Sequence, residues 1–147
     1  MMKKLKGLLK NQKGLTLIEL LAVIVILAII ASIAVPAIGG IIAKSQDRAI
    51  LADASNVLSG AKLAIANNEC TKSGTDYTCS GPVLKGYVEN SKIVNADQIT
   101  KSTATNGTSE YTITYAQFKN IKNLTVNGIG GSDTTLTEAE LRTAMGN

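Results

Sequence analysis

Apolar side chains dominate the first third of the chain and change their spacing part-way along it. Segment 15–42 is apolar at nearly every position; the exceptions are Thr16, Glu19, Ser32, Pro36, Gly39 and Gly40. A helix of this length is about 42 Å long at about 1.5 Å per residue, whereas the hydrocarbon core of a bilayer is about 30 Å thick. The pattern therefore predicts a helix over residues 15–42 that spans a membrane.

From Lys44 to Ala66 the apolar positions narrow to one face of a helix. The face recurs at spacings of three and four and comprises Ile50, Ala54, Val57, Ala61 and Ala64, flanked by Leu51, Leu58 and Ile65. This stripe predicts that the helix continues and covers a sheet. The polar residues are expected mainly on the other face: Asp47, Arg48, Asp53, Asn56 and Lys62.

Two features disturb the helix between its apolar and amphipathic halves. Pro36 lacks a backbone N–H and crowds the preceding turn, and Gly39-Gly40 adds backbone freedom nearby. We expect a kink or a local loss of helix at this point.

Beyond Asn67 the chain is rich in Thr, Ser, Asn and Gly, with short β-prone segments between turn signals. Residues 111–115 alternate in polarity, which predicts a strand. Its positions on one face are Tyr111, Ile113 and Tyr115. A segment around Ile99 is expected to pair with this strand through a turn at Asn106-Gly107.

Three further segments carry weaker signals. Residues 124–126 precede an Asn-Gly turn and predict a third strand, whereas residues 83–88 fit either a strand or a short helix. Thr137 and Glu140 have the spacing of a capping box, which predicts a short C-terminal helix. The apolar residues of that helix are Leu141 and Met145.

Cys70 and Cys79 enclose eight residues that include Gly74, so a turn could bring them together. On the oxidising side of a membrane such a pair forms a disulfide, whereas in the cytosol it more often remains as two thiols. Two thiolates without further Cys or His do not complete a tetrahedral zinc site. We therefore expect no bound metal.

The length of 147 residues fits one modest domain with an appendage. The predicted fold is α+β: a long N-terminal helix whose second half packs on a small antiparallel sheet, a loop closed by the two cysteines, and a short C-terminal helix. The chain has no histidine, which removes the usual general base and the commonest metal ligand. We expect a protein without enzymatic activity or a cofactor; a membrane-anchored enzyme is the alternative.

The net charge of +4 comes from the extreme N-terminus. Five lysines precede Gly14: Lys3, Lys4, Lys6, Lys10 and Lys13. Of the 15 basic residues, ten then remain against 11 acidic ones, which leaves about −1, so the overall basicity does not indicate nucleic-acid binding. Lysines on one side of an apolar run place the N-terminus in the cytoplasm.

Segment 13–19 reads Lys-Gly-Leu-Thr-Leu-Ile-Glu and leads directly into the apolar run. It resembles the leader junction of type IV pilins and of the pseudopilins of type II secretion and competence systems. That junction is a basic residue and Gly, then an apolar residue, Thr, two apolar residues and Glu. The chain matches at Lys13, Gly14, Thr16, Leu17, Ile18 and Glu19, and departs at Leu15, where the family most often has Phe.

The resemblance implies that a prepilin peptidase cleaves after Gly14 and that Leu15, the new N-terminus, is methylated. It also implies that Glu19 of an incoming subunit neutralises the N-terminal amine of a neighbour. From the residues alone, the amine of Leu15 lies one helical turn before Glu19, so pairing within one chain stays open. The expected regions are a leader (1–14), a transmembrane and filament-core helix (15–42) and a globular domain (43–147).

The function implied by the resemblance is structural, as a subunit of a type IV pilus, with a pseudopilin as the alternative. The implied partners are copies of the chain itself, the prepilin peptidase and N-methyltransferase, the membrane protein of the pilus assembly platform, and membrane lipid before assembly. The implied location is the bacterial cytoplasmic membrane, then the cell surface.

Three other interpretations stay open from the sequence. A secretory signal would be cut at Ser32-Ile33-Ala34, and an uncleaved single-pass anchor would keep its leader. A DNA-binding subunit would stack bases on Tyr111 and Tyr115, although alternating tyrosines more often belong to a sheet core. The lysines available to it are dispersed along the sequence: Lys85, Lys92, Lys119 and Lys122.

Overall fold

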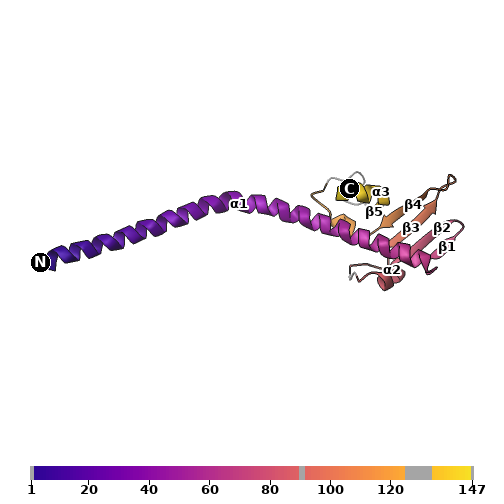
Figure 1. Ribbon diagram of the computed structural model, residues 1–147, viewed down its shortest axis with the longest axis horizontal. Helices are drawn as coiled ribbons and strands as arrows, with labels where there is room; N and C mark the ends of the chain where they lie inside the picture. The colour runs from indigo at the N-terminus through magenta and orange to yellow at the C-terminus, as the bar shows by residue number, and fades with distance from the viewer. Residues whose placement is uncertain (1, 90–91, 125–133, 147) are drawn as a thin grey trace. The chain divides into compact units, whose positions relative to one another are not determined.

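The computed structural model describes residues 2–89, 92–124 and 134–146, with side chains from Thr16 onward (Figure 1). The chain divides into two compact units, Met1–Ile41 and Ile42–Asn147. The first unit is helical over its described length, and the second contains every described strand. The structure confirms the predicted α+β fold.

Helix α1 (Met2–Ala66) contains both the apolar and the amphipathic segments. Pro36 lies inside this helix without ending it, so the local loss of helix expected there is absent from this structure. The helix stops at Ala66, as the pattern predicted. Its last turn closes with N–H donation from Glu69 to the carbonyl of Ala64, and Asn68 adopts the left-handed conformation that often terminates helices.

The sheet is antiparallel throughout and follows the chain order β1-β2-β3-β4-β5. Its strands are β1 (Thr71–Ser73), β2 (Asp76–Ser80), β3 (Gln98–Thr103), β4 (Ser109–Thr114) and β5 (Thr135–Thr137). The remaining elements are α2 (Gly81–Tyr87), the 3-10 helix η1 (Ala116–Asn120) and α3 (Glu138–Met145). Figure 1 shows the C-terminal part of α1 beside this sheet, with β1 and β5 at its edges.

The predicted central hairpin is confirmed. Ile99 of β3 lies opposite Ile113 of β4, and Gly107 takes a positive φ of 82° in the turn between them. A second hairpin, β1 and β2, turns at Gly74 with a φ of 63°. The sequence had indicated only a turn within a closed loop here, and it gave no signal for β5.

One row of buried side chains crosses four strands and forms the floor of the core. Directly paired positions place Cys79, Ile99, Ile113 and Leu136 side by side on β2 to β5, each 1% exposed or less. The buried face of α1 packs in the same core, and its members are Leu51, Ala54, Val57, Leu58, Ala61 and Ala64. Three of these six are alanine, which lets the helix approach the sheet closely.

The weaker predictions had mixed outcomes. Residues 83–88 lie mainly in the short helix α2, which has Pro82 in its first turn, where a missing N–H costs no hydrogen bond. Leu124 is outside any strand, and the rest of the predicted strand 124–126 and its turn lie outside the described residues. The predicted capping box is confirmed: Thr137 accepts a hydrogen bond from the Glu140 N–H, and Glu140 accepts one from the Thr137 N–H.

The prediction that Asp47 lies on the outer face of α1 was wrong, because its side chain is only 3% exposed. Its carboxylate accepts hydrogen bonds from three successive backbone N–H groups, those of Lys122, Asn123 and Leu124. The Asn123 and Leu124 nitrogens lie 2.6 and 3.0 Å from Oδ2. The charge is therefore solvated by backbone amides instead of water, and it fastens the chain after η1 to α1.

Replacing Asp47 with Asn should lower the free energy of unfolding by about 1–3 kcal/mol. The amide keeps one acceptor oxygen but turns an NH2 group toward backbone donors, which leaves buried N–H groups unpaired. Chemical denaturation of the full chain in detergent measures the change. Asp53→Asn is the matched control, because Asp53 lies on the same helix in a long ion pair of 3.6 Å with partly exposed Lys92. A loss as large in the control would contradict the role of the amide contacts.

Candidate functional site

The apolar half of α1 carries nearly all the exposed large hydrophobic side chains of the described residues. From Leu17 to Ile42 its large hydrophobic side chains are between 49% and 70% exposed. Within the described residues, α1 alone is long and apolar enough to cross a membrane, and none of its most apolar window, with a mean hydropathy of 3.0, is buried. A surface of this kind is stable only against lipid or other protein.

Glu19 is the single charged residue between Thr16 and Ala43. Its side chain is exposed and forms no ion pair with any residue whose side chain is described. Gly14 and Leu15 belong to the same helix, one turn before it. Ser32, the other polar side chain deep in the run, donates a hydrogen bond of 2.7 Å to the carbonyl of Ile29, which satisfies it within the helix. Unlike the Ser32 hydroxyl, the Glu19 carboxylate therefore has no ion-pair partner among the described side chains to offset its charge.

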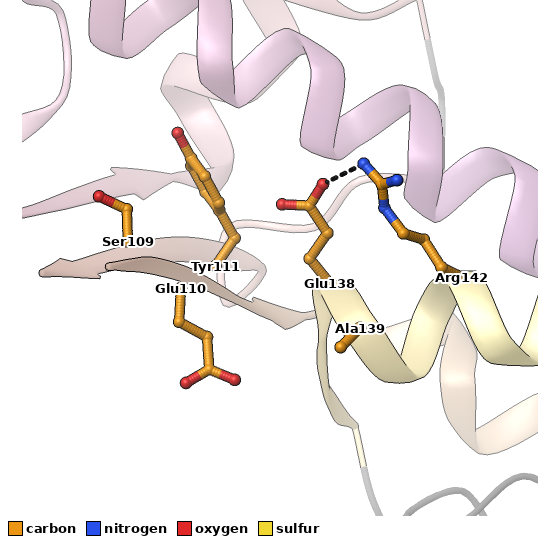
Figure 2. Close-up of a pocket in the computed structure, with 6 residues that line it drawn as sticks. All are labelled: Ser109, Glu110, Tyr111, Glu138, Ala139 and Arg142. Carbon is orange, nitrogen blue, oxygen red and sulfur yellow. Dashed lines mark hydrogen bonds and ion pairs between the residues drawn. The ribbon is translucent and has the colours of Figure 1, made fainter. Parts of the chain in front are cut away.

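The second polar site lies where α3 meets α1 and β4 (Figure 2). The Glu138 carboxylate accepts hydrogen bonds from Lys62 Nζ at 2.8 Å and from Arg142 Nη2 at 2.9 Å. Lys62 Nζ also lies 4.7 Å from the centre of the Tyr111 ring. Lys62, expected on the outer face of α1, is instead partly buried and joins the helix to α3.

A shallow pocket of about 280 Å³ opens beside this cluster. It is lined by Ser109, Glu110, Tyr111, Glu138, Ala139 and Arg142. Figure 2 shows the Glu110 side chain pointing to the opposite side of the strand from Tyr111. The lining contains no cysteine or histidine.

Folding changes the proton affinity of two carboxyls in α3. Burial raises the pKa of Glu138, but the hydrogen bonds and charges of Lys62 and Arg142 outweigh that effect and lower it below its usual value. The pKa of Glu140 is lowered by the hydrogen bonds from the backbone and side chain of Thr137. Both carboxylates therefore stabilise the folded chain when they are ionised.

The cysteines and tyrosines named from the sequence fall into the C-terminal unit. A disulfide joins Cys70 to Cys79 across the base of the first hairpin, with Cα atoms 4.6 Å apart. Tyr115 is fully buried and packs edge to face with Phe118 at 5.6 Å, so it cannot stack bases. Tyr111 is half-buried beneath Lys62.

Comparison with known families identifies the N-terminal segment. Residues 9–35 match the family described as the prokaryotic N-terminal methylation motif. The chain carries the N-terminal motif of type IV pilin-like prepilins. No curated protein and no solved structure gives a significant match to the chain.

The prepilin motif covers 27 of the 147 residues and includes Gly14, Leu15 and Glu19. It ends one residue before Pro36 and lies entirely in the first unit. The motif thus accounts for the uncovered apolar helix as a membrane anchor of a prepilin-type protein. It does not extend to Asp47, Lys62 or the sheet, whose roles follow from the structure alone.

Acidification should weaken the attachment of α3. Both carboxyl pKa values are lower in the folded chain than their ordinary value of 4.5. Their contribution is therefore complete above that value and is lost as the pH falls through the lower folded values. We expect the stability gap between the parent and the Glu138→Gln, Glu140→Gln double variant to be present at pH 7 and smaller at pH 2. Thermal unfolding at the two pH values measures it, and an equal gap at both would contradict the assignment.

Proposed function

We propose that this chain is a structural subunit of a type IV pilus, processed by prepilin peptidase after Gly14 and assembled through α1. The observation that supports it best is the coincidence of the prepilin motif with an apolar helix that the chain itself leaves uncovered. In the membrane, lipid covers this helix, and in the filament, the helices of neighbouring copies replace the lipid. Similar apolar surface is hidden in both states, so the transfer is not opposed by exposure to water.

Cleavage also has an electrostatic role in this proposal. A charged side chain near the middle of a bilayer costs about 2.5–3.5 kcal/mol on insertion scales. Cutting after Gly14 creates an α-amine on Leu15, and methylation of that amine retains its positive charge. Glu19 can then pair with the amine of its own chain or of a neighbour. Pairing with a neighbour's amine would favour one register between adjacent subunits.

The proposed topology places the leader lysines in the cytoplasm and residues 43–147 outside. The disulfide in that region fits an oxidising exterior. A peptidase with methyltransferase activity and the membrane protein of the assembly platform are the proposed partners on the way to the filament. A pseudopilin of a secretion or competence system would use the same cleavage and the same helix, and it is the alternative function.

Mass spectrometry of the mature protein should show a chain that begins at Leu15 and carries one methyl group on its α-amine. Gly14→Leu should abolish processing, because the side chain obstructs the extended fit of the junction in the peptidase. Gly7→Leu is the matched control, since it places the same change within the leader away from the junction. A mature chain that begins near Val35, or one that keeps its leader, would sink the proposal.

Replacing Glu19 with Gln should leave cleavage intact and reduce the amount of the chain in sheared surface filaments by at least about tenfold. The amide cannot neutralise a buried amine, so incoming subunits lose their charge partner. Glu69→Gln removes an exposed carboxylate outside the apolar run and should assemble normally. Electron microscopy of cells lacking the chain tests the pilus against the pseudopilin, because loss of long surface filaments is expected only for the pilus subunit.

A further inference from the structure

Four residues form a straight row across the sheet that the sequence order conceals. Lys72 lies opposite Tyr77, Tyr77 opposite Lys101, and Lys101 opposite Tyr111 on consecutive strands β1 to β4. Directly paired residues of antiparallel strands project from the same face. We name these four residues the Lys–Tyr row; β1 to β4, which carry it, lie side by side in Figure 1.

Each ring of the Lys–Tyr row is in contact with an ammonium group. Lys72 Nζ and Lys101 Nζ lie 5.4 and 5.7 Å from the centre of the Tyr77 ring, and Lys62 of α1 lies over Tyr111. Lys72 is exposed on the edge strand, and the other three members of the row are half-buried. The end of the row at Lys72 is therefore open to solvent, and the Tyr77 ring beside it is partly exposed.

The row carries excess positive charge, although residues 15–147 together are nearly neutral. Neither Lys72 nor Lys101 forms an ion pair with a described residue, and Lys62 and Arg142 share the single carboxylate of Glu138. The acids next to the row in sequence, Asp76 and Glu110, alternate to the opposite face. Asp76 is also occupied by the N–H of Thr103. The row and its neighbours on α1 and α3 thus include four cations, Lys62, Lys72, Lys101 and Arg142, whose only ion-paired carboxylate among the described residues is Glu138.

We propose that the Lys–Tyr row binds single-stranded nucleic acid, with a base on Tyr77 and the adjoining phosphates on Lys72 and Lys101. Two lysines flank the ring as two phosphates flank each base along a strand. At a solvent-exposed site an ammonium group holds a ring more weakly than a base stacks on it, so a ligand can displace the lysines. The released ammonium groups are then free to contact phosphate.

The tyrosines of the row favour single-stranded nucleic acid over other polyanions. A row of lysines alone would suit any polyanion, including duplex DNA, whose base faces are hidden inside the stack. Alternation of lysine with tyrosine favours a strand that offers both phosphates and free base faces. This inference does not depend on assembly into a filament, because every residue involved belongs to the unit Ile42–Asn147.

The full chain in detergent micelles should bind a fluorescently labelled oligothymidylate of about 20 nucleotides, measured by anisotropy at low salt. It should bind that strand at least about fivefold more tightly than an abasic strand of equal length, because stacking contributes to the first only. A duplex of the same length should also bind more weakly than the single strand. No binding at low salt, equal binding of the abasic strand, or tighter binding of the duplex would each overturn the proposal.

Variants locate the site. Tyr77→Leu should remove the preference for bases, and Tyr77→Phe should keep it. The Lys72→Ala, Lys101→Ala double variant should weaken binding and reduce the salt slope by about 1.4, since each phosphate contact on a single strand contributes about 0.7.

Lys85→Ala combined with Lys119→Ala is the matched control, because it removes two exposed lysines outside the row. Thermal unfolding of each variant identifies any that fails to fold. If Tyr77→Leu fails, the conservative Tyr77→Phe and the lysine pair still decide the matter. Unchanged binding by the lysine variant, or an equal loss in the control, would show that the row is not the site.

Discussion

The apolar half of α1 cannot be covered by the chain that contains it, and the rest of the molecule is arranged around this constraint. Its side chains remain exposed from Leu17 to Ile42, although the same helix buries a full face a few turns later. Such a surface requires lipid or other protein around it, and in the proposed function lipid covers it first and other helices cover it later. In that proposal the leader, the lone carboxylate Glu19 and the separate folded unit each serve a chain that exists in both surroundings.

The folded unit has few large side chains, so polar contacts hold what apolar packing does not. The chain contains one Phe and no Trp, and half of the buried face of α1 is alanine. Two carboxylates fasten the loops instead. Asp47 binds the backbone of residues 122–124, and the buried Asp97 accepts hydrogen bonds of 2.8 Å from the N–H groups of Val94 and Ala116. Each of these two carboxylates joins segments that are distant in sequence or that lack regular structure of their own.

Sequence patterns predicted the elements that have long or specific signals. The 3.6-residue period located α1 to its final residue, the alternation at 111–115 located β4, and Thr137 with Glu140 located α3. Strands β1 and β5 have three residues each, too few to show a period. The contacts of Asp47 with residues 122–124, of Lys62 with Glu138, and of Lys72 with Tyr77 and Lys101 depend on tertiary position or strand register. The sequence pattern of an amphipathic helix does not indicate which of its polar residues a distant loop will bind.

Two carboxylates on α1, Glu19 and Asp47, differ in when they gain the partners that balance their charge. Asp47 obtains its partners when the C-terminal unit folds, because backbone amides of the same chain solvate it. Glu19 has no such partner among the described side chains, and in the proposed function its cation exists only after the peptide bond at Gly14 is cut. The C-terminal unit can therefore reach its structure while the chain is still a precursor. In the proposed function, the apolar half then acquires electrostatic balance only through cleavage, which would make processing a condition for assembly.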